Sequence, residues 1–121
     1  MRVLLDTNFL IDLIRFKIDI TAINELVGYH KLATISSVVT ELERIARQNT
    51  KSSSYAKLAL KLIDENRIEI IKSDRRPDEI ILDMTGKDSM AATNDMELRK
   101  KLKAANVKSI YLKSKKHLAI G

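Results

Sequence analysis

Cysteine and tryptophan are both absent from this chain of 121 residues. Without cysteine the protein has no disulfide, no thiol nucleophile and no cysteine-ligated zinc or iron–sulfur site. Three tyrosines and two phenylalanines are its only aromatic residues, so an extended platform for stacking nucleobases is not expected. The composition therefore excludes several common kinds of catalytic and binding site.

Long apolar runs are also missing. The longest, Phe9 to Ile14, is interrupted by Asp12 and is too short to cross a bilayer. The apolar residues before Asp6 are too few for the hydrophobic region of a secretory signal. We therefore expect a cytoplasmic protein that does not associate with membranes. Internal repeats and low-complexity segments are absent, and the length suits a single domain spanning residues 1–121.

Positive charge is in excess, with a formal net charge of +6. Hydrophobic residues make up 45% of the chain and charged residues 31%, which is typical of a globular protein with a charge-rich surface. The excess of cations favours a polyanionic partner, such as nucleic acid or an acidic protein. Charge alone does not decide the matter, because many lysine-rich proteins bind neither.

Short apolar runs alternate along the chain with segments of helical periodicity. Strands are predicted at Arg2 to Leu5, Tyr29 to Ile35, Arg67 to Ile71, Asp88 to Ala92 and Lys108 to Leu112. Six helices are predicted, of which the first follows Asp6 and the second ends at Gly28. The third begins at an N-cap residue, Ser36 or Ser37, and the fourth follows an exposed loop at Gln48 to Ser54. The last two span Pro77 to Met84 and Asn94 to Ala105. The tail after Lys113 is basic. This alternation predicts an α/β protein, a three-layer α/β/α sandwich with a central parallel sheet.

Two acids follow predicted strands directly. Asp6 comes after the first strand, and Asp95 comes just after the strand that ends near Thr93. The carboxyl ends of parallel strands share one edge of the sheet, which is where open α/β sheets bind ligands. Asp6 is the more informative acid, because a carboxylate next to three buried apolar residues is costly unless it is solvated, hydrogen-bonded or bound to a cation.

Two further acids are predicted near the same edge. Asp78 opens a helix there, and Glu41 lies one turn into the helix after the second strand. Helix capping and the helix dipole would explain Asp78 or Asp95 taken singly, and spacing does not distinguish Glu41 from Glu43. Four clustered carboxylates would repel one another unless a hard divalent cation relieved the repulsion. Mg²⁺ or Mn²⁺ is therefore the predicted cofactor.

Four segments of the chain resemble the PIN-domain family. They are VLLDTNFL near the start, SSVVTELERIA in the middle, RRPDEII after it, and ATNDMELRKKLK towards the end. Each fragment is weak alone, but the order of the four acids and the D-T-N opening make the combination specific. Within the family, the segments look most like an archaeal branch related to ribosomal-RNA processing nucleases, with VapC-type toxins as the other close neighbours.

The resemblance implies a metal-dependent ribonuclease that hydrolyses RNA phosphodiester bonds. It assigns metal binding and catalysis to Asp6, Glu41, Asp78 and Asp95, and so selects Glu41 over Glu43. Supporting hydrogen bonds would come from Thr7, Asn8, Thr93 and Asn94. Pro77 stands where many members have an alanine, which leaves Glu79 and Asp83 as alternatives to Asp78.

Basic residues near these acids are candidates for binding RNA phosphates, although a solvated lysine-rich face is the ordinary alternative. The candidates are Arg44, Arg47, Arg75, Arg76, Arg99 and Lys100. Lys113, Lys115 and Lys116 follow in the tail. His30 and His117 are isolated from the acidic motifs and are not expected to be catalytic.

Functions other than a nuclease fit the sequence less well. A non-catalytic PIN-fold module that binds RNA or protein is the main alternative, and it conflicts with the complete set of four acids. A receiver domain fits poorly because adjacent acids after the first strand are missing. A dehalogenase-like phosphatase would need an aspartate where Asn8 stands. Expected partners are RNA, an antitoxin or a ribosome-assembly factor, and a second copy of the chain that packs through residues such as Leu13, Phe16 and Ile20.

Overall fold

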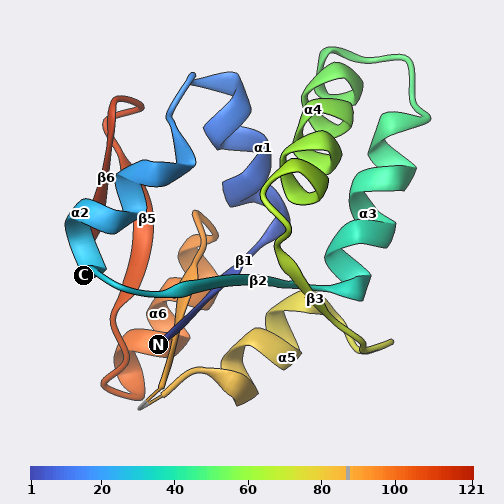
Figure 1. Cartoon of the computed structure of the whole chain (residues 1–121). Helices are drawn as coiled ribbons and strands as arrows, with labels where there is room; N and C mark the ends of the chain where they lie inside the picture. The colour runs from blue at the N-terminus through green and yellow to red at the C-terminus, as the bar shows by residue number, and fades with distance from the viewer. Residues whose placement is uncertain (87) are drawn as a thin grey trace.

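The computed structural model describes residues 1–86 and 88–121 and has a central sheet covered by helices (Figure 1). The strands are β1 (Arg2–Leu5), β2 (Lys31–Ile35), β3 (Glu69–Ile71), β4 (Ser89–Ala92), β5 (Ser109–Lys113) and β6 (His117–Ile120). The helices are α1 (Thr7–Arg15), η1 (Ile20–Ala22), α2 (Ile23–Val27), α3 (Ser36–Ala46), α4 (Lys51–Glu65), α5 (Pro77–Met84) and α6 (Met96–Ala104). The predicted α/β class and the five predicted strands are confirmed.

The sheet has the strand order β3-β2-β1-β4-β5-β6. β1 lies at its centre and pairs in parallel with β2 on one side and with β4 on the other. β3 and β5 extend the parallel sheet, whereas β6 pairs antiparallel with β5. The sheet is therefore mixed, with one antiparallel strand added to the parallel sheet that the sequence predicted.

Two groups of helices cover the sheet. α1, α3 and α4 pack against one another, and α5 packs against α6 (Figure 1). Right-handed crossovers explain this separation, because the chain moves outward from β1 to β3 and then returns across the sheet to β4 and β5. The three-layer arrangement expected from the sequence follows.

One apolar core joins the layers. The β1 residues Val3, Leu4 and Leu5 are fully buried, as are Phe9 and Leu10 of α1. A continuous apolar run is what a strand buried on both faces requires. The core therefore fixes the position at which β1 ends and Asp6 begins. No helix in the described part of the chain is long and apolar enough to cross a membrane.

Three local features differ from the predictions. Ser36 and Ser37 do not cap α3, because Ile35 is the N-cap residue and the Ser36 hydroxyl bonds the backbone of Ser73 instead. The serines predicted as a loop form the first turn of α4, where the buried Ser53 hydroxyl accepts a hydrogen bond from the Thr50 N–H. The basic tail contains β6, a short edge strand in which Leu118 is the buried residue.

Candidate active site

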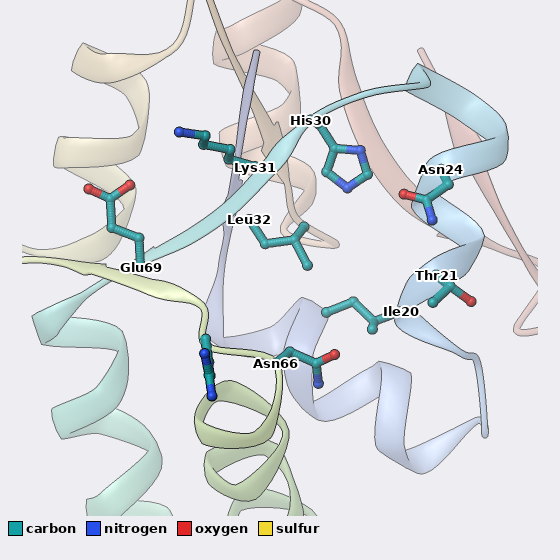
Figure 2. Close-up of a pocket in the computed structure, with 9 residues that line it drawn as sticks. Ile20, Thr21, Asn24, His30, Lys31, Leu32, Asn66 and Glu69 are labelled. Atoms are coloured by element: carbon teal, nitrogen blue, oxygen red, sulfur yellow. The ribbon is translucent and has the colours of Figure 1, made fainter.

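One cavity opens at the amino ends of the strands and another at their carboxyl ends. At the amino ends of β2 and β3, a cavity of about 380 Å³ is lined by Thr21, Asn24, His30, Lys31 and Glu69, among others (Figure 2). The His30 Nδ1 atom lies 2.7 Å from the Gly28 carbonyl oxygen and donates a hydrogen bond to it, so this nitrogen is already engaged within the chain. Of the four acids predicted for the site, all within the described chain, none lines this cavity.

A smaller cavity, of about 210 Å³, lies at the carboxyl ends of the strands. Asp6, Glu41, Asp78 and Asp95 all line it. They come from four elements, since Asp6 follows β1, Glu41 lies in α3, Asp78 in the first turn of α5, and Asp95 is the N-cap residue of α6. The remaining lining residues are Thr7, Asn8, Arg76 and Pro77. The structure thus brings the four acids to one cavity, at the edge where α/β sheets bind ligands.

Asp6 is held rigidly in this cavity. Its Oδ1 atom accepts a 2.9 Å hydrogen bond from the Thr7 N–H and caps α1, and its Oδ2 atom accepts a 2.7 Å bond from the Thr93 hydroxyl. The side chain is buried, and this burial raises the pKa of the Asp6 carboxyl above its usual value. The two hydrogen bonds oppose the rise in pKa, whereas the charges of Asp95 and Glu41 add to it. Asp6 therefore experiences the negative field of the other acids.

Thr93 connects Asp6 with Asp95. Its fully buried hydroxyl donates to Asp6 and accepts a 3.1 Å hydrogen bond from the Asp95 N–H. Asp95 in turn caps α6, because its Oδ1 atom accepts hydrogen bonds from the Glu97 and Leu98 N–H groups. Capping occupies one carboxylate oxygen of Asp95 and leaves Oδ2 outside the hydrogen bonds of the cap.

Two asparagines fix the loop between β4 and α6. The Asn8 Oδ1 atom accepts a 3.1 Å hydrogen bond from the Asn94 N–H. The Asn94 side chain donates to Asp12 of α1 and accepts from the Leu112 N–H of β5, both at 2.8 Å. The loop is thus tied to a helix and a strand that are far apart in sequence. Asp12 was not predicted from the sequence, which offered no signal beyond its helical position.

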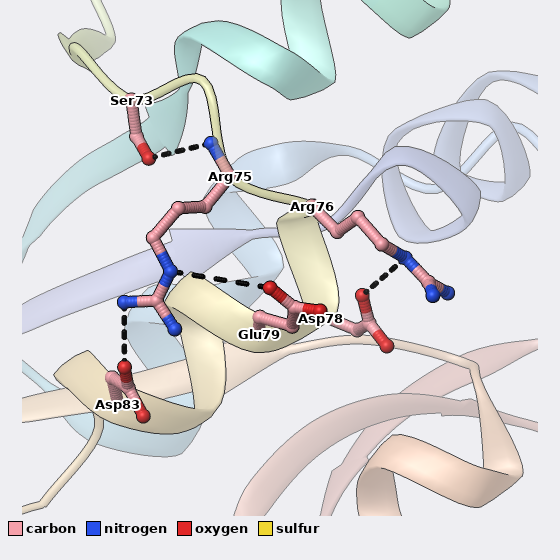
Figure 3. A network of polar contacts seen from close by, with 6 residues as sticks. All are labelled: Ser73, Arg75, Arg76, Asp78, Glu79 and Asp83. Atoms are coloured by element: carbon pink, nitrogen blue, oxygen red, sulfur yellow. Dashed lines mark hydrogen bonds and ion pairs between the residues drawn. The ribbon is translucent and has the colours of Figure 1, made fainter.

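The acids of α5 take different directions. Asp78 faces the cavity and lies 3.5 Å from the Arg76 Nε atom, whereas Asp83 pairs with Arg75 at 2.7 Å (Figure 3). Glu79 lies at the 4.0 Å limit of an ion pair with Arg75. Both alternatives to Asp78 are therefore engaged outside the cavity.

The predicted basic residues are dispersed. Arg76 lines the cavity, Arg75 is paired with acids of α5, and the Arg99 guanidinium carbon lies 3.5 Å from the centre of the Tyr111 ring. The other three predicted cations, Arg44, Arg47 and Lys100, are exposed and are not among the described residues that line the cavity. Leu13 and Ile20, which were expected to contact a second copy of the chain, are buried in the core and are not at the surface.

The donor atoms at the cavity are suited to a hard cation. All four acids and the Thr7 hydroxyl offer oxygen, and the buried Thr7 Oγ1 atom has no hydrogen-bond partner among the described residues. Within that same part of the chain, no three acids or histidines are close enough to enclose one ion. Mg²⁺ commonly uses one or two carboxylates and keeps several waters, so an open set of acids is compatible with it.

Comparison with known proteins gives the family. The model of the PIN-like domain family matches residues 3–115. No curated protein matches the sequence. Several solved structures are similar to the chain, among them these two. One is the PIN domain endonuclease Utp24, at 21% identity over 98% of this chain and 90% of that one, with a TM-score of 0.79. The other is a domain of a functionally unknown protein from Methanocaldococcus jannaschii DSM 2661, at 21% identity over 93% and 91%, with a TM-score of 0.61. The matched range includes all four acids of the cavity, from Asp6 to Asp95. This chain therefore belongs to the PIN-like domain family.

Proposed function

We propose that this protein is a divalent-metal-dependent endoribonuclease whose active site is the cavity lined by Asp6, Glu41, Asp78 and Asp95. The observation that carries the proposal is that acids from four separate elements converge on one small cavity. No single helix cap or helix dipole explains that convergence. A fold similar to that of an endonuclease is consistent with the proposal.

Mg²⁺ or Mn²⁺ would bind these carboxylates and supply the charge that activates water and stabilises a leaving oxygen. The chain's own contribution is positioning. Thr93 and the Thr7 N–H hold both oxygens of Asp6, and the α6 cap holds one oxygen of Asp95. These bonds fix the two acids before any ligand arrives, which lowers the cost of organising the site.

Arg76 is the cation placed to meet a phosphate. It lines the cavity, its side chain is largely exposed, and its partner Asp78 is one of the proposed metal ligands. If Asp78 bound a cation, the Arg76 guanidinium would be free to bind a phosphate oxygen, a pairing that arginine makes readily. Arg76 would thereby position the RNA backbone beside the acids.

The test is cleavage of single-stranded and structured RNA by the purified protein with Mg²⁺, with Mn²⁺ and with a chelator. Asp6→Asn and Asp95→Asn should each abolish cleavage while leaving the circular dichroism spectrum unchanged. Asp64→Asn, in the exposed part of α4, is the matched control and should cleave normally. Tight RNA binding without cleavage in either metal would instead favour a non-catalytic binding module.

The biological role follows from a second measurement. A ribosomal-RNA processing enzyme and a VapC-like toxin would share this site but differ in their targets. Expression of the active protein in bacteria should arrest growth if it is a toxin, and the Asp6→Asn variant should not. A processing enzyme should leave growth unchanged and cut a precursor RNA at a defined position.

A further inference from the structure

The hairpin formed by β5 and β6 extends beyond the carboxyl ends of the parallel strands, where the four acids lie. β4 ends at Ala92, which pairs with Ile110 of β5. β5 continues for three more residues, about 10 Å at the usual strand rise, before the turn at 114–116. The hairpin tip therefore projects on the side of the molecule where Asp6 and Asp95 lie.

Cations gather on this projection. Lys113, Lys115 and Lys116 are exposed, and the Lys115 Nζ atom lies 5.9 Å from the centre of the Phe16 ring at the end of α1. Within residues 1–86 and 88–121, none of these lysines forms an ion pair. The tip thus carries positive charge that the described acids do not neutralise.

Arg99 links β5 with α6, the helix whose N-cap residue Asp95 lines the cavity. It lies four residues after Asp95, on the same face of α6. Its guanidinium stacks on the Tyr111 ring, and its buried Nε atom has no hydrogen-bond partner in the part of the chain described. Stacking on an aromatic ring holds an arginine in place without consuming its charge.

Tyr111 and Lys113 point to the same face of β5, because alternate residues of a strand share a face. Leu112, between them, packs against the core. Because Arg99 stacks on Tyr111, it lies on the same face of the sheet as Lys113. Lys116 lies on the opposite face, where it lines a cavity with Asp19, Glu25 and Leu118. Two cations on one face, the first of them one helical turn after Asp95, complement the backbone of a polyanion whose scissile phosphate lies in the acidic cavity.

We propose that Arg99, Tyr111 and Lys113 form a track that binds the phosphates of single-stranded RNA and leads from the acidic cavity along β5. The proposal rests on the proposed nuclease function and names the surface that holds its substrate. Tyr111 acts as a positioning residue for Arg99.

The test measures binding of a labelled single-stranded RNA of about 12 nucleotides in a chelator, so that cleavage does not contribute. The variant Lys113→Glu should weaken binding by at least about threefold at low salt. The slope of log K against log salt should fall by about 0.7 for each phosphate that the variant no longer neutralises. The control, Lys57→Glu in α4, makes the same charge change on the other side of the molecule (Figure 1) and should bind as the wild type does.

A second pair of variants tests the role of Tyr111. Tyr111→Phe keeps the ring under Arg99 and should bind RNA normally, whereas Tyr111→Leu should bind more weakly. Equal weakening by Lys113→Glu and Lys57→Glu, or no weakening by Lys113→Glu, would overturn the track. Equal affinity of the two Tyr111 variants would overturn the positioning of Arg99. Because cleavage is not measured, absence of nuclease activity would count against the proposed function and not against the track.

Discussion

Asp6 combines burial with negative neighbours, and this combination ties its protonation to the stability of the fold. Burial is the largest cause of its raised pKa, with smaller contributions from Asp95 and Glu41. Between the ordinary pKa of 3.8 and the raised value, the folded chain binds the proton more tightly than the unfolded chain does. The stability of the metal-free protein therefore falls as pH rises through that interval.

Asp6→Asn should make the metal-free protein more stable at neutral pH. Asparagine caps helices as well as aspartate does, so the bond from the Thr7 N–H is preserved while the buried charge is removed. The asparagine NH2 group can donate to the Thr93 hydroxyl, which donates to Asp6 in the wild type. The gain should shrink as pH falls and disappear below pH 3.8, where aspartate is protonated in both states. Urea unfolding in a chelator at several pH values measures the difference. A wild type more stable than the variant at neutral pH would contradict this account of Asp6.

Thr93→Val should destabilise the fold by about 1–3 kcal/mol, because it leaves Oδ2 of the buried Asp6 carboxylate without a donor and the Asp95 N–H without an acceptor. Valine has nearly the same shape as threonine, so packing changes little. Thr93→Ser keeps the hydroxyl and is the control, with a smaller loss expected. Chemical unfolding of the three proteins gives the comparison, and equal losses for valine and serine would assign the effect to packing.

The acids following β1 and β4 could be placed from the sequence, because a strand that ends in a polar cluster fixes where its next side chain lies. Glu41 and Asp78 were harder, since Glu43 and Glu79 have almost the same spacing. The fold separates them: Glu43 is exposed, and Glu79 turns toward Arg75. Contacts such as that of Asn94 with Asp12 depend on packing between distant segments, which local spacing does not encode.

At the scale of the element, three helices end in the same way. α1, α4 and α6 are each followed by a residue of positive φ that is not glycine, namely Lys17, Arg67 and Asn106. In α4, the Ile68 N–H bonds the Ile63 carbonyl and the Arg67 N–H bonds that of Asp64, which is a Schellman motif. With only three glycines in the chain, the usual stop signal was missing from the sequence at these ends. It was present at Gly28, where the predicted end is confirmed.

Arg67→Gly should therefore stabilise the protein by about 1 kcal/mol, since a left-handed conformation costs an L-residue about 1–2 kcal/mol and glycine almost nothing. The expected rise in Tm is about 3 °C. Arg67→Ala removes the same side chain but keeps the Cβ atom, so it should give no gain. Thermal unfolding followed by circular dichroism compares the three proteins. A glycine variant no more stable than the alanine variant would show that φ of 49° carries no penalty here.

At the scale of the whole molecule, strands from all parts of the chain meet around β1. The sequence indicated that parallel strands alternate with helices, but it did not indicate which strands are neighbours. β1 pairs with β2 and β4, so residues about 30 and about 90 positions apart are side by side. β6 escaped prediction because an edge strand with one buried residue has little apolar pattern.

Leu4→Ala tests whether this core is one cooperative unit. Leu4 is fully buried in the central strand, with Ala33 and Ala91 as its partners on either side. Truncation should lower the free energy of unfolding by about 2–5 kcal/mol and should leave the denaturant m-value unchanged. Because the core links both groups of helices to the sheet, backbone circular dichroism and tyrosine absorbance should report the same midpoint in the wild type and in the variant. Two separate midpoints would mean that the helices on one face of the sheet unfold independently of those on the other.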